Sequence, residues 1–372
     1  MLLARLFTST RASISHFRSV IMESTPSKVA KNMVTIGTHD GKFHCDEVLA
    51  CYMLRRLPEY CDAEIKRSRD PAVLADCDVV VDVGGVYDPA IHRYDHHQKS
   101  FTGTMSSLTD GGKKWQTKLS SAGLVYLHFG HRVISQLLGN NQSVDSNTIN
   151  VIYDKVYENF LEEIDAIDNG INQYDGGTER YRVSTTLSGR VGHLNTPWNH
   201  PDYSNNSRQD EQFVKAMKLV GEEFTDRVMA YKNIWLPARE IVQTAITNRC
   251  QVDPGGAIIK LEVPCPWTDH LFELEEEMNL TGQIKFVLYS ESERGRWRIQ
   301  CVPVSVGSFT NRLSLHSDWC GLRDDVLSKT SGIDGGVFVH MSGFIGGNET
   351  YDGVLQMGQK TLEFAAATAS NI

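Results

Sequence analysis

The sequence predicts a two-domain α/β protein, with a mainly parallel sheet in an N-terminal domain and a smaller α+β domain at the C-terminus. Between residues 34 and 167, short apolar runs alternate with longer segments of helical periodicity, which is the pattern of parallel strands joined by crossover helices. After about residue 246 the pattern changes to strands separated by turns. The chain has 372 residues, enough for two ordinary hydrophobic cores. We expect a first domain at 33–200, a linker and connecting helix at 201–245, and a second domain at 246–372.

The first domain begins with strands and a helix in alternation. Met33–Thr38 is an apolar run that predicts a buried strand, and apolar residues at helical spacing follow in Val48–Leu57. Further strands are predicted at Ala63–Arg67 and Val79–Val83, and the second of these is apolar enough to be buried on both faces. In a parallel sheet, ligands bind at the carboxyl ends of the strands. The loops after the first and third strands are therefore the first place to look for a site.

The middle of the first domain contains a polar stretch and two helices. Phe101–Lys118 is rich in Gly, Ser, Thr and Lys, and we predict a mobile surface loop near the site. Ser121–Leu138 and Asn147–Ile167 have helical spacing. The Asn-Gly pair at 169–170 is typical of a helix end, which would leave Asp168 exposed there.

The second half of the chain starts with a linker and a long helix. The polar stretch Asn199–Gln209 precedes an amphipathic helix whose apolar stripe runs from Phe213 to Val228. We place the domain boundary within this linker and helix. The predicted strands of the second domain, with a hairpin turn at Glu293–Gly295, are Ala257–Val263, Gln283–Ser290, Arg296–Val304 and Gly336–Met341.

Composition excludes several classes of protein. No apolar run reaches the roughly 18 residues of a membrane span, so we expect no membrane partner. The eight cysteines include no C-x-x-C pair, which argues against a zinc ribbon and a thioredoxin motif and favours reduced thiols. The formal net charge of -9 gives weak overall attraction to nucleic acid. A polyanion would therefore be held by local cations or by bound metal.

Residues 1–32 form a segment of different composition. It contains several arginines among apolar and hydroxyl residues but no acidic residue before Glu23, which is typical of a mitochondrial transit peptide. A disordered tail is the alternative. Met22 and Met33 offer starts for shorter products. We therefore expect the mitochondrial matrix as the location, with a second nuclear or nucleolar pool left open.

Histidines and aspartates gather at the predicted strand and helix ends. Mixed imidazole and carboxylate ligands suit manganese, iron or zinc better than magnesium. The set is too large for one ion with an open position, and two ions about 3.5 to 4 Å apart would use it fully. We predict two divalent ions, manganese first, with magnesium or zinc as alternatives. The candidates are His39, His44, Asp46, Asp82, Asp95, His96, His97 and Asp168.

Two groups of motifs resemble known families. Asp95-His96-His97, after the strand that ends at Asp82, resembles the signature of the DHH phosphoesterase superfamily. Thr38–Glu47 and Gly343–Asn348 resemble the melanocyte-proliferating-gene exonuclease family, and the similarity extends from Val34 to the C-terminus. The resemblance implies a DHH-type catalytic domain followed by a substrate-binding domain. It also implies a 3′-to-5′ RNA exonuclease of mitochondria and nucleolus.

The same resemblance implies roles for the metal ligands. Asp82 would bridge the two ions, and His39 and Asp46 would each bind one of them. Asp168 matches the late aspartate of the superfamily, although Asp165 could replace it. These assignments are carried over position by position from the superfamily pattern.

In the triplet, the resemblance implies three different tasks. His96 would be a further ligand, Asp95 would fix its tautomer from behind, and His97 would face the substrate phosphate. One position departs from the superfamily. His44 stands where an aspartate ligand is expected, and it is either a ligand itself or is replaced by Asp40.

The second domain resembles the substrate-binding module of the superfamily. Glycines permit backbone amides to converge on an anion, so Gly346 and Gly347 are predicted to contact substrate. His340 and Lys99 would add contacts to phosphate. A pair of tight turns is the alternative for the glycines.

The predicted function is hydrolysis of phosphodiesters by two metals. The expected substrate is single-stranded RNA or a short oligonucleotide, shortened from its 3′ end, and both details come from the resemblance. Two alternatives stay open. One is a small-molecule phosphohydrolase acting on pyrophosphate or a cyclic dinucleotide, and the other is a non-catalytic RNA-binding protein of the same fold.

Overall fold

The computed structural model describes residues 33–139, 144–177, 181–291 and 295–369. The transit peptide predicted at 1–32 lies outside these residues, as does the hairpin turn predicted at 293–295 apart from Gly295. Both stay predictions. Within the described ranges, no helix combines the length and the apolar character that crossing a membrane requires.

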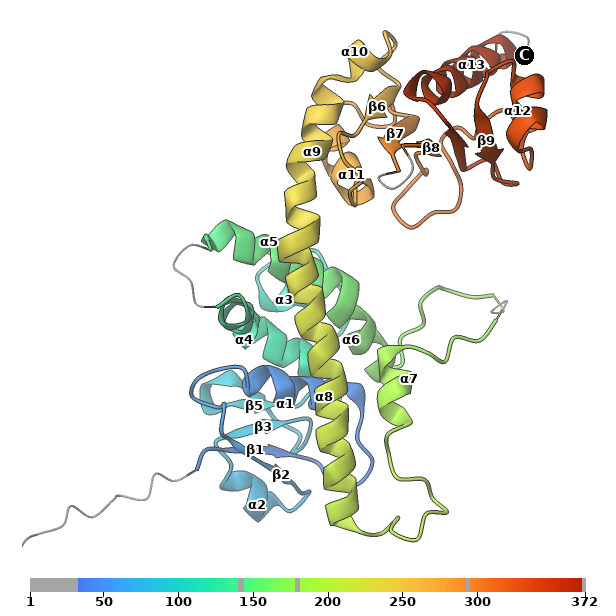
Figure 1. Ribbon diagram of the computed structural model, residues 1–372. Helices are drawn as coiled ribbons and strands as arrows, with labels where there is room; N and C mark the ends of the chain where they lie inside the picture. Colours follow the sequence, from blue (N-terminus) through green and yellow to red (C-terminus); the bar gives the residue numbers. More distant parts are fainter. Residues whose placement is uncertain (1–32, 140–143, 178–180, 292–294, 370–372) are drawn as a thin grey trace, which may run out of the picture. The chain divides into compact units, whose positions relative to one another are not determined.

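The first sheet has five strands in the order β2-β1-β3-β5-β4 (Figure 1). The strands β2, β1, β3 and β5 run parallel to one another, and β4 pairs antiparallel with β5. The prediction of a mainly parallel sheet is confirmed, although β4 and β5 have only two residues each and were not predicted. The strands are β1 (Thr35–Thr38), β2 (Glu64–Arg67), β3 (Val79–Val81), β4 (Tyr87–Asp88) and β5 (Arg93–Tyr94).

Several helices surround this sheet in the first half of the chain. Both helices predicted between residues 121 and 167 are present, the second as α5, a wider π turn and α6 in succession. The elements are α1 (Cys45–Leu54), α2 (Pro71–Ala75), η1 (Pro89–Ile91), α3 (Met105–Leu108), α4 (Ser121–Leu137), α5 (Ser146–Val156), η2 (Tyr157–Leu161), α6 (Glu162–Asp168) and α7 (Leu187–Gly192).

The segment predicted as a mobile surface loop, Phe101–Lys118, is instead partly built into the core. It contains α3, whose Met105 is fully buried, and Trp115, which is 8% exposed. The polar composition of the segment gave no indication that Met105 and Trp115 would be buried. The surface-loop prediction is wrong for this part of the segment.

The strand β3 separates two apolar layers, as its composition predicts. Val79 and Val81 pack in the large core with α1 and α4, whereas Val80 faces Leu74 and Cys77 beside α2. In Figure 1, α1 and α2 accordingly lie on opposite sides of the sheet. Burial on both faces fixes the register of the strand and hence the position of the residue that follows it.

The predicted long helix exists and continues further than predicted. It consists of α8 (Asn206–Ala230), a π turn η3 (Tyr231–Trp235) and α9 (Leu236–Thr247) without interruption. The predicted apolar stripe is buried. Pro237 has no backbone N–H to donate, and the wide turn directly precedes it.

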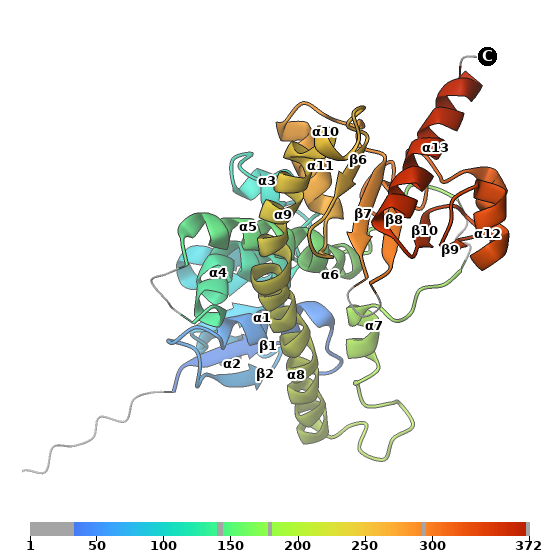
Figure 2. The same cartoon turned by 45° about the horizontal axis from the view of Figure 1, so that its top comes forward.

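The second sheet has the order β6-β7-β8-β10-β9 and is antiparallel except for the β6–β7 pair. The helix α13 packs against its strands (Figure 2). All four predicted strands are present. The strands are β6 (Ile258–Lys260), β7 (Phe286–Ser290), β8 (Trp297–Cys301), β9 (Gly336–Val339) and β10 (Ile345–Asn348), and the helices are α10 (Arg249–Val252), α11 (Thr268–Glu277), η4 (Ser317–Trp319), α12 (Asp324–Ser331) and α13 (Tyr351–Ala369).

The fifth strand, β10, corrects the prediction of an amide nest. Gly346 and Gly347 pair with β8 on one side and β9 on the other, so their backbone groups belong to the sheet. A Cβ on Gly347 would overlap the guanidinium of Arg298. The turn lies earlier, at Gly343, which has a φ of 67°. The absence of a side chain at Gly346 and Gly347 thus allows neighbouring residues to pack closely against this strand. Contact of these glycines with substrate stays a prediction.

Candidate metal centre

The backbone of the loop between β1 and α1 is held by hydrogen bonds at three of its residues. The helix α1 begins after His44, whose backbone N–H donates to both carboxylate oxygens of Glu47 at 2.9 and 3.0 Å. The side-chain amide of Asn195 accepts from the N–H of Phe43 at 2.9 Å and donates to its carbonyl at 2.9 Å. The guanidinium of Arg67 donates to the carbonyl of Gly41 at 2.6 Å. The histidines of this loop are therefore held in place by the surrounding chain.

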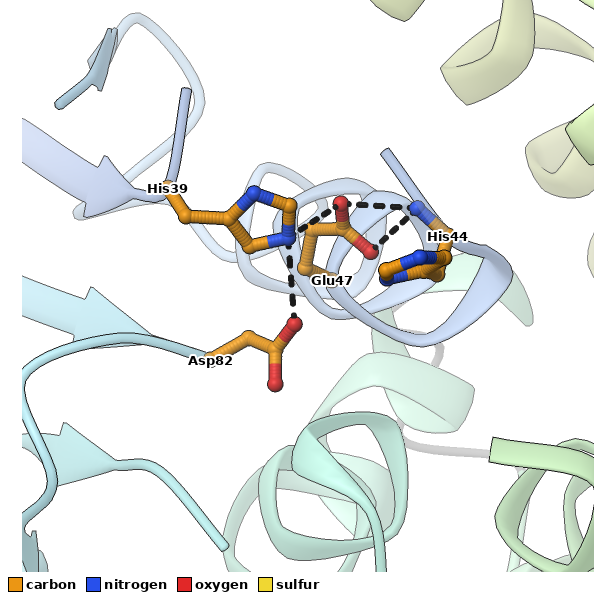
Figure 3. A group of neighbouring side chains, drawn as sticks. All are labelled: His39, His44, Glu47 and Asp82. Carbon is orange, nitrogen blue, oxygen red and sulfur yellow. Dashed lines mark hydrogen bonds and ion pairs between the residues drawn. The ribbon is translucent and has the colours of Figure 1, made fainter. Parts of the chain in front are cut away.

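The first ligand group consists of His39, His44, Glu47 and Asp82 (Figure 3). His39 Nε2 lies 3.0 Å from Glu47 Oε1 and 3.4 Å from Asp82 Oδ2. Its other ring nitrogen lies 2.9 Å from the carbonyl oxygen of Asp40. If Nδ1 donates to that carbonyl, Nε2 is left free to bind a metal.

The alternative ligand Asp40 points elsewhere. Its carboxylate lies 3.3 Å from the Nε of Arg69, and its side chain is 46% exposed. Among the described residues, the ligand groups include His44 and not Asp40. The geometry therefore favours His44 over Asp40 as the ligand.

Glu47 was not named as a candidate from the sequence. It is fully buried, and one carboxylate oxygen faces both the backbone of His44 and the ring of His39. The available signal was its place at the third residue of a helix, where a glutamate caps the helix start. That position predicts the hydrogen bond with the backbone of His44 but not the contact with the imidazole of His39.

Asp82 stands between the two halves of the site. It follows β3 directly and has a φ of 57°, an uncommon backbone conformation for a residue with a side chain. Its Oδ2 faces His39, and its Oδ1 lies 3.4 Å from His96 Nε2 and accepts from Ser121 Oγ at 3.1 Å. Burial would raise the pKa of Asp82, but the two imidazoles hold this pKa well below its usual range.

The second half of the site contains Asp46, His96 and Asp168. His96 Nε2 lies 3.0 Å from Asp168 Oδ2, and His44, Asp46 and Asp168 form a further ligand group. Burial raises the pKa of Asp46, and the charges of Asp82 and Asp168 raise it further. Three carboxylates thus crowd one small volume.

The alternative ligand Asp165 is occupied by the protein itself. Its carboxylate accepts from the Ser120 N–H at 2.9 Å, the Ser120 hydroxyl at 2.7 Å, the Gly123 N–H at 3.1 Å and the Tyr157 hydroxyl at 3.0 Å. It is fully buried and belongs to no ligand group among the described residues. The geometry favours Asp168.

The division of tasks within the triplet needs a correction. Asp95 was predicted to orient His96, but its Oδ1 lies 2.8 Å from His97 Nδ1. Backbone N–H groups of Gly85, at 2.6 Å, and His97, at 3.0 Å, fix the carboxylate in this direction. His96 Nδ1 lies instead 3.2 Å from the side-chain oxygen of Asn169, a residue predicted only as part of a helix end.

The residues present fit divalent metal ions. Asp46 Oδ1 and His96 Nε2 are buried and have no hydrogen-bond partner among the described residues. His96 Nε2 lies close to Asp168 without hydrogen-bond geometry. Uncompensated buried polar atoms are costly, and crowded carboxylates repel one another. Cations at these positions would satisfy the orphan atoms and neutralise the repulsion.

An open cleft of about 550 Å³ adjoins the ligand groups. One side is lined by His44, Asp46, His97 and Asp168, and the other by α7 and the residues before it. The side chain of His97 is 60% exposed. A ligand in this cleft would reach both the metal positions and His97.

The predicted substrate-binding residues lie outside the lining of this cleft. Lys99 is exposed, two residues beyond His97. His340 is exposed at the end of β9, where its Nδ1 lies 2.9 Å from the hydroxyl of Ser342. The polar residues that do line the cleft, among them Arg182, Ser188 and His193, were not predicted from the sequence.

Comparison with known proteins identifies the family. A family model described as uncharacterised protein family UPF0160 matches residues 35–362. The MYG1 exonuclease of Homo sapiens is 56% identical over 330 residues, which cover 88% of this chain and 85% of the human protein. The chain belongs to the MYG1 exonuclease family.

Other members of the MYG1 family span the same length. The MYG1 exonuclease of Bos taurus is 53% identical over 352 residues, which cover 93% of this chain and 90% of the bovine protein. The MYG1 protein YER156C of Saccharomyces cerevisiae is 42% identical over 342 residues, covering 90% of this chain and 97% of the yeast protein. The family prediction made from the two motif regions is confirmed.

One solved structure covers nearly the whole chain at low similarity. The pGpG-specific phosphodiesterase PggH of Vibrio cholerae aligns over 90% of this chain and 99% of its own, with 11% identity and a TM-score of 0.26. At that score the likeness carries no argument about the fold. Membership of the DHH superfamily stays a prediction.

Proposed function

We propose that the protein is a metal-dependent phosphodiesterase that shortens single-stranded RNA from its 3′ end. The observation that carries this proposal is a set of three overlapping ligand groups whose members His44, Asp46, His97 and Asp168 line an open cleft. The groups are His39, His44, Glu47 and Asp82; Asp82, His96 and His97; and His44, Asp46 and Asp168. The name exonuclease given to mammalian relatives supports the reaction class. The RNA substrate and the polarity rest on the family resemblance.

Two divalent ions, manganese first, are the proposed cofactors. The first position would be held by His39, His44, Glu47 and Asp82, and the second by Asp46, Asp82, His96 and Asp168. When bound, such ions lower the pKa of water and neutralise charge on phosphoryl oxygens. Asp82, with one oxygen toward each group, would keep the two positions adjacent.

His97 is the proposed contact with the substrate phosphate. The hydrogen bond with Asp95 raises the pKa of His97, and burial opposes this only in part. A more basic imidazole holds its proton more readily near neutral pH and can donate it to a phosphoryl or departing oxygen. Asp95 orients the ring by holding Nδ1, which leaves Nε2 as the donor toward the cleft.

The decisive experiment uses end-labelled RNA and DNA oligomers with manganese, magnesium or zinc. We expect a ladder of mononucleotide steps on RNA with manganese, and no products from Asp82→Asn. RNA labelled at the 5′ end would show progressive shortening if digestion begins at the 3′ end. If the wild type leaves RNA intact but releases phosphate from pyrophosphate or cleaves a cyclic dinucleotide, the proposal is wrong in its substrate.

The cellular location is a separate proposal. The composition of residues 1–32 supports import into the mitochondrial matrix. A fluorescent fusion of the full chain should enter mitochondria, and a fusion that starts at Met33 should not. Uniform cytosolic fluorescence of the full-length fusion would contradict this.

A further inference from the structure

The cleft beside the ligand groups has a second wall that the metal chemistry does not use. This wall consists of α7 and the residues that precede it. The cleft volume of about 550 Å³ lies in the range that holds one small organic ligand. Arg182, Gly192 and His193 belong to this wall.

The second wall is held in a fixed position by its own contacts. The Thr186 hydroxyl accepts from the N–H of Gly189 at 3.1 Å and caps the start of α7. Arg190 makes a two-pronged ion pair with Glu223 of α8, in which Nη2 lies 2.7 Å from Oε2. The apolar face of α7 is buried. The cleft is therefore largely preformed, which lowers the entropic cost of binding.

The cleft is lined by both charged and apolar side chains. Its metal-binding side would hold a phosphate, while Ile164 and Ile167 contribute apolar surface. Arg182 and His193 line the cleft and are exposed. A guanidinium suits a second phosphate, and an imidazole suits a sugar hydroxyl or a base edge.

We infer that this cleft is the subsite for the terminal nucleoside monophosphate of the substrate. The scissile phosphate lies at the ligand groups, the nucleoside lies against α7, and Arg182 faces the adjoining phosphate. This inference rests on the proposed function and adds the unit that is recognised. One nucleotide fills the cleft, so products leave as single nucleotides.

Gly192 provides a clean test of the subsite. It lines the cleft, its backbone needs no positive φ, and an added Cβ meets no atom within 4 Å. Gly192→Leu therefore fills the cleft without straining the fold, and Gly192→Ala fills it partly. Gly189 is unsuitable because its Cβ would meet the carbonyl of Ser184 at 2.7 Å. Ser207→Leu, exposed and outside the cleft, is the matched control.

The measurements use the full chain loaded with manganese. For Gly192→Leu we expect KM for an RNA oligomer and Kd for adenosine monophosphate to rise about ten-fold or more, with Gly192→Ala between it and wild type. Methyl p-nitrophenyl phosphate has no nucleoside, so its hydrolysis should be unchanged. Ser207→Leu should match wild type throughout. Arg182→Gln should raise KM for RNA and weaken its dependence on salt.

The outcomes separate the subsite from the function. If the wild type hydrolyses no diester, the proposed function fails. If the wild type shortens RNA but Gly192→Leu binds adenosine monophosphate and RNA as tightly as wild type, the subsite is wrong and the function stands. An equal loss on RNA and on the small diester would also overturn the subsite, because it would place the damage at the metal centre.

Discussion

Glu47 combines two contacts that are usually separate. Its carboxylate caps α1 through the N–H of His44, and it faces the ring nitrogen of His39 that is available for metal. A glutamine can still accept the capping hydrogen bond but has no negative charge. We expect Glu47→Gln to keep the fold and to lower manganese affinity about 10- to 100-fold, as measured by metal titration. If the variant binds manganese as tightly as the wild type, Glu47 acts only as a helix cap and not as a metal ligand.

Asp165 gives a pH-dependent test of burial. Burial raises the pKa of Asp165 to about 7, although hydrogen bonds from Ser120, Tyr157 and Gly123 oppose the shift. A folded-state pKa above the unfolded value near 3.9 means that the native state binds the proton more tightly. The stabilisation from this proton is complete below about pH 4 and is lost as the pH rises to about 7.

Asp165→Asn should remove this dependence because the amide does not titrate. We expect the unfolding free energy of the variant, relative to wild type, to rise between pH 4 and 7 by up to about 4 kcal/mol. Urea unfolding at several pH values measures it, and the other titrating groups are common to both proteins. Parallel curves for the two proteins would show that Asp165 is ionised throughout.

At the residue scale, the ligands that could be predicted are those that stand beside a recognisable strand or inside a sequence motif. Asp82 follows an apolar strand, and the triplet stands in a motif, so both were found. Asn169 was missed because its contact with His96 bridges 73 positions of the chain. Asp95 was assigned to the wrong histidine because backbone N–H groups fix the direction of its carboxylate, and no pattern of residue types shows that direction.

At the scale of elements, the loop before α1 depends on a residue far along the chain. Asn195 makes two hydrogen bonds with the backbone of Phe43, which directly precedes His44. We expect Asn195→Leu, similar in shape, to lower the unfolding free energy by about 2 to 4 kcal/mol, because two backbone groups lose their partner. Chemical unfolding measures this.

The same substitution should weaken metal binding through the position of His44. Asn195→Asp can still accept from the Phe43 N–H and should lie between wild type and Asn195→Leu in both stability and manganese affinity. A loss of stability without any change in metal affinity would mean that the loop keeps its geometry without this clamp.

Elements were predictable where apolar residues dominate. The long helix and the strands β1, β2, β3 and β6 to β9 follow from periodicity and branched apolar runs. The strand β10 was missed because two glycines lack strand propensity, and sheet pairing on both sides decides their conformation instead. The strands β4 and β5 have two residues each, too few to show the alternation of apolar and polar residues that predicts a strand.

At the scale of the whole molecule, metal binding and stability should be linked. A ligand at 100 times its Kd adds about 2.7 kcal/mol to the unfolding free energy. We therefore expect manganese to raise the melting temperature of the wild type by roughly 5 to 10 °C and to leave Asp82→Asn unchanged. Differential scanning calorimetry with and without chelator measures both. Equal shifts in the two proteins would place the stabilising ion elsewhere.

This stabilisation should depend on pH in a defined direction. Burial lowers the pKa of His39 and His96, but neighbouring carboxylates outweigh it and raise them to about 10 and about 9. Metal must displace these protons, so affinity should increase as the pH rises from 6 to 9. The shift in melting temperature caused by manganese should increase over the same range.

The backbone of Asp82 also limits which residues the position tolerates. At a φ of 57°, asparagine and glycine fit with little strain, whereas β-branched residues do not. A library of variants selected only for folding should therefore retain aspartate, asparagine and glycine at this position. Selection for activity should retain aspartate alone. Residues retained under selection for folding but lost under selection for activity would satisfy the backbone conformation at this position without binding metal.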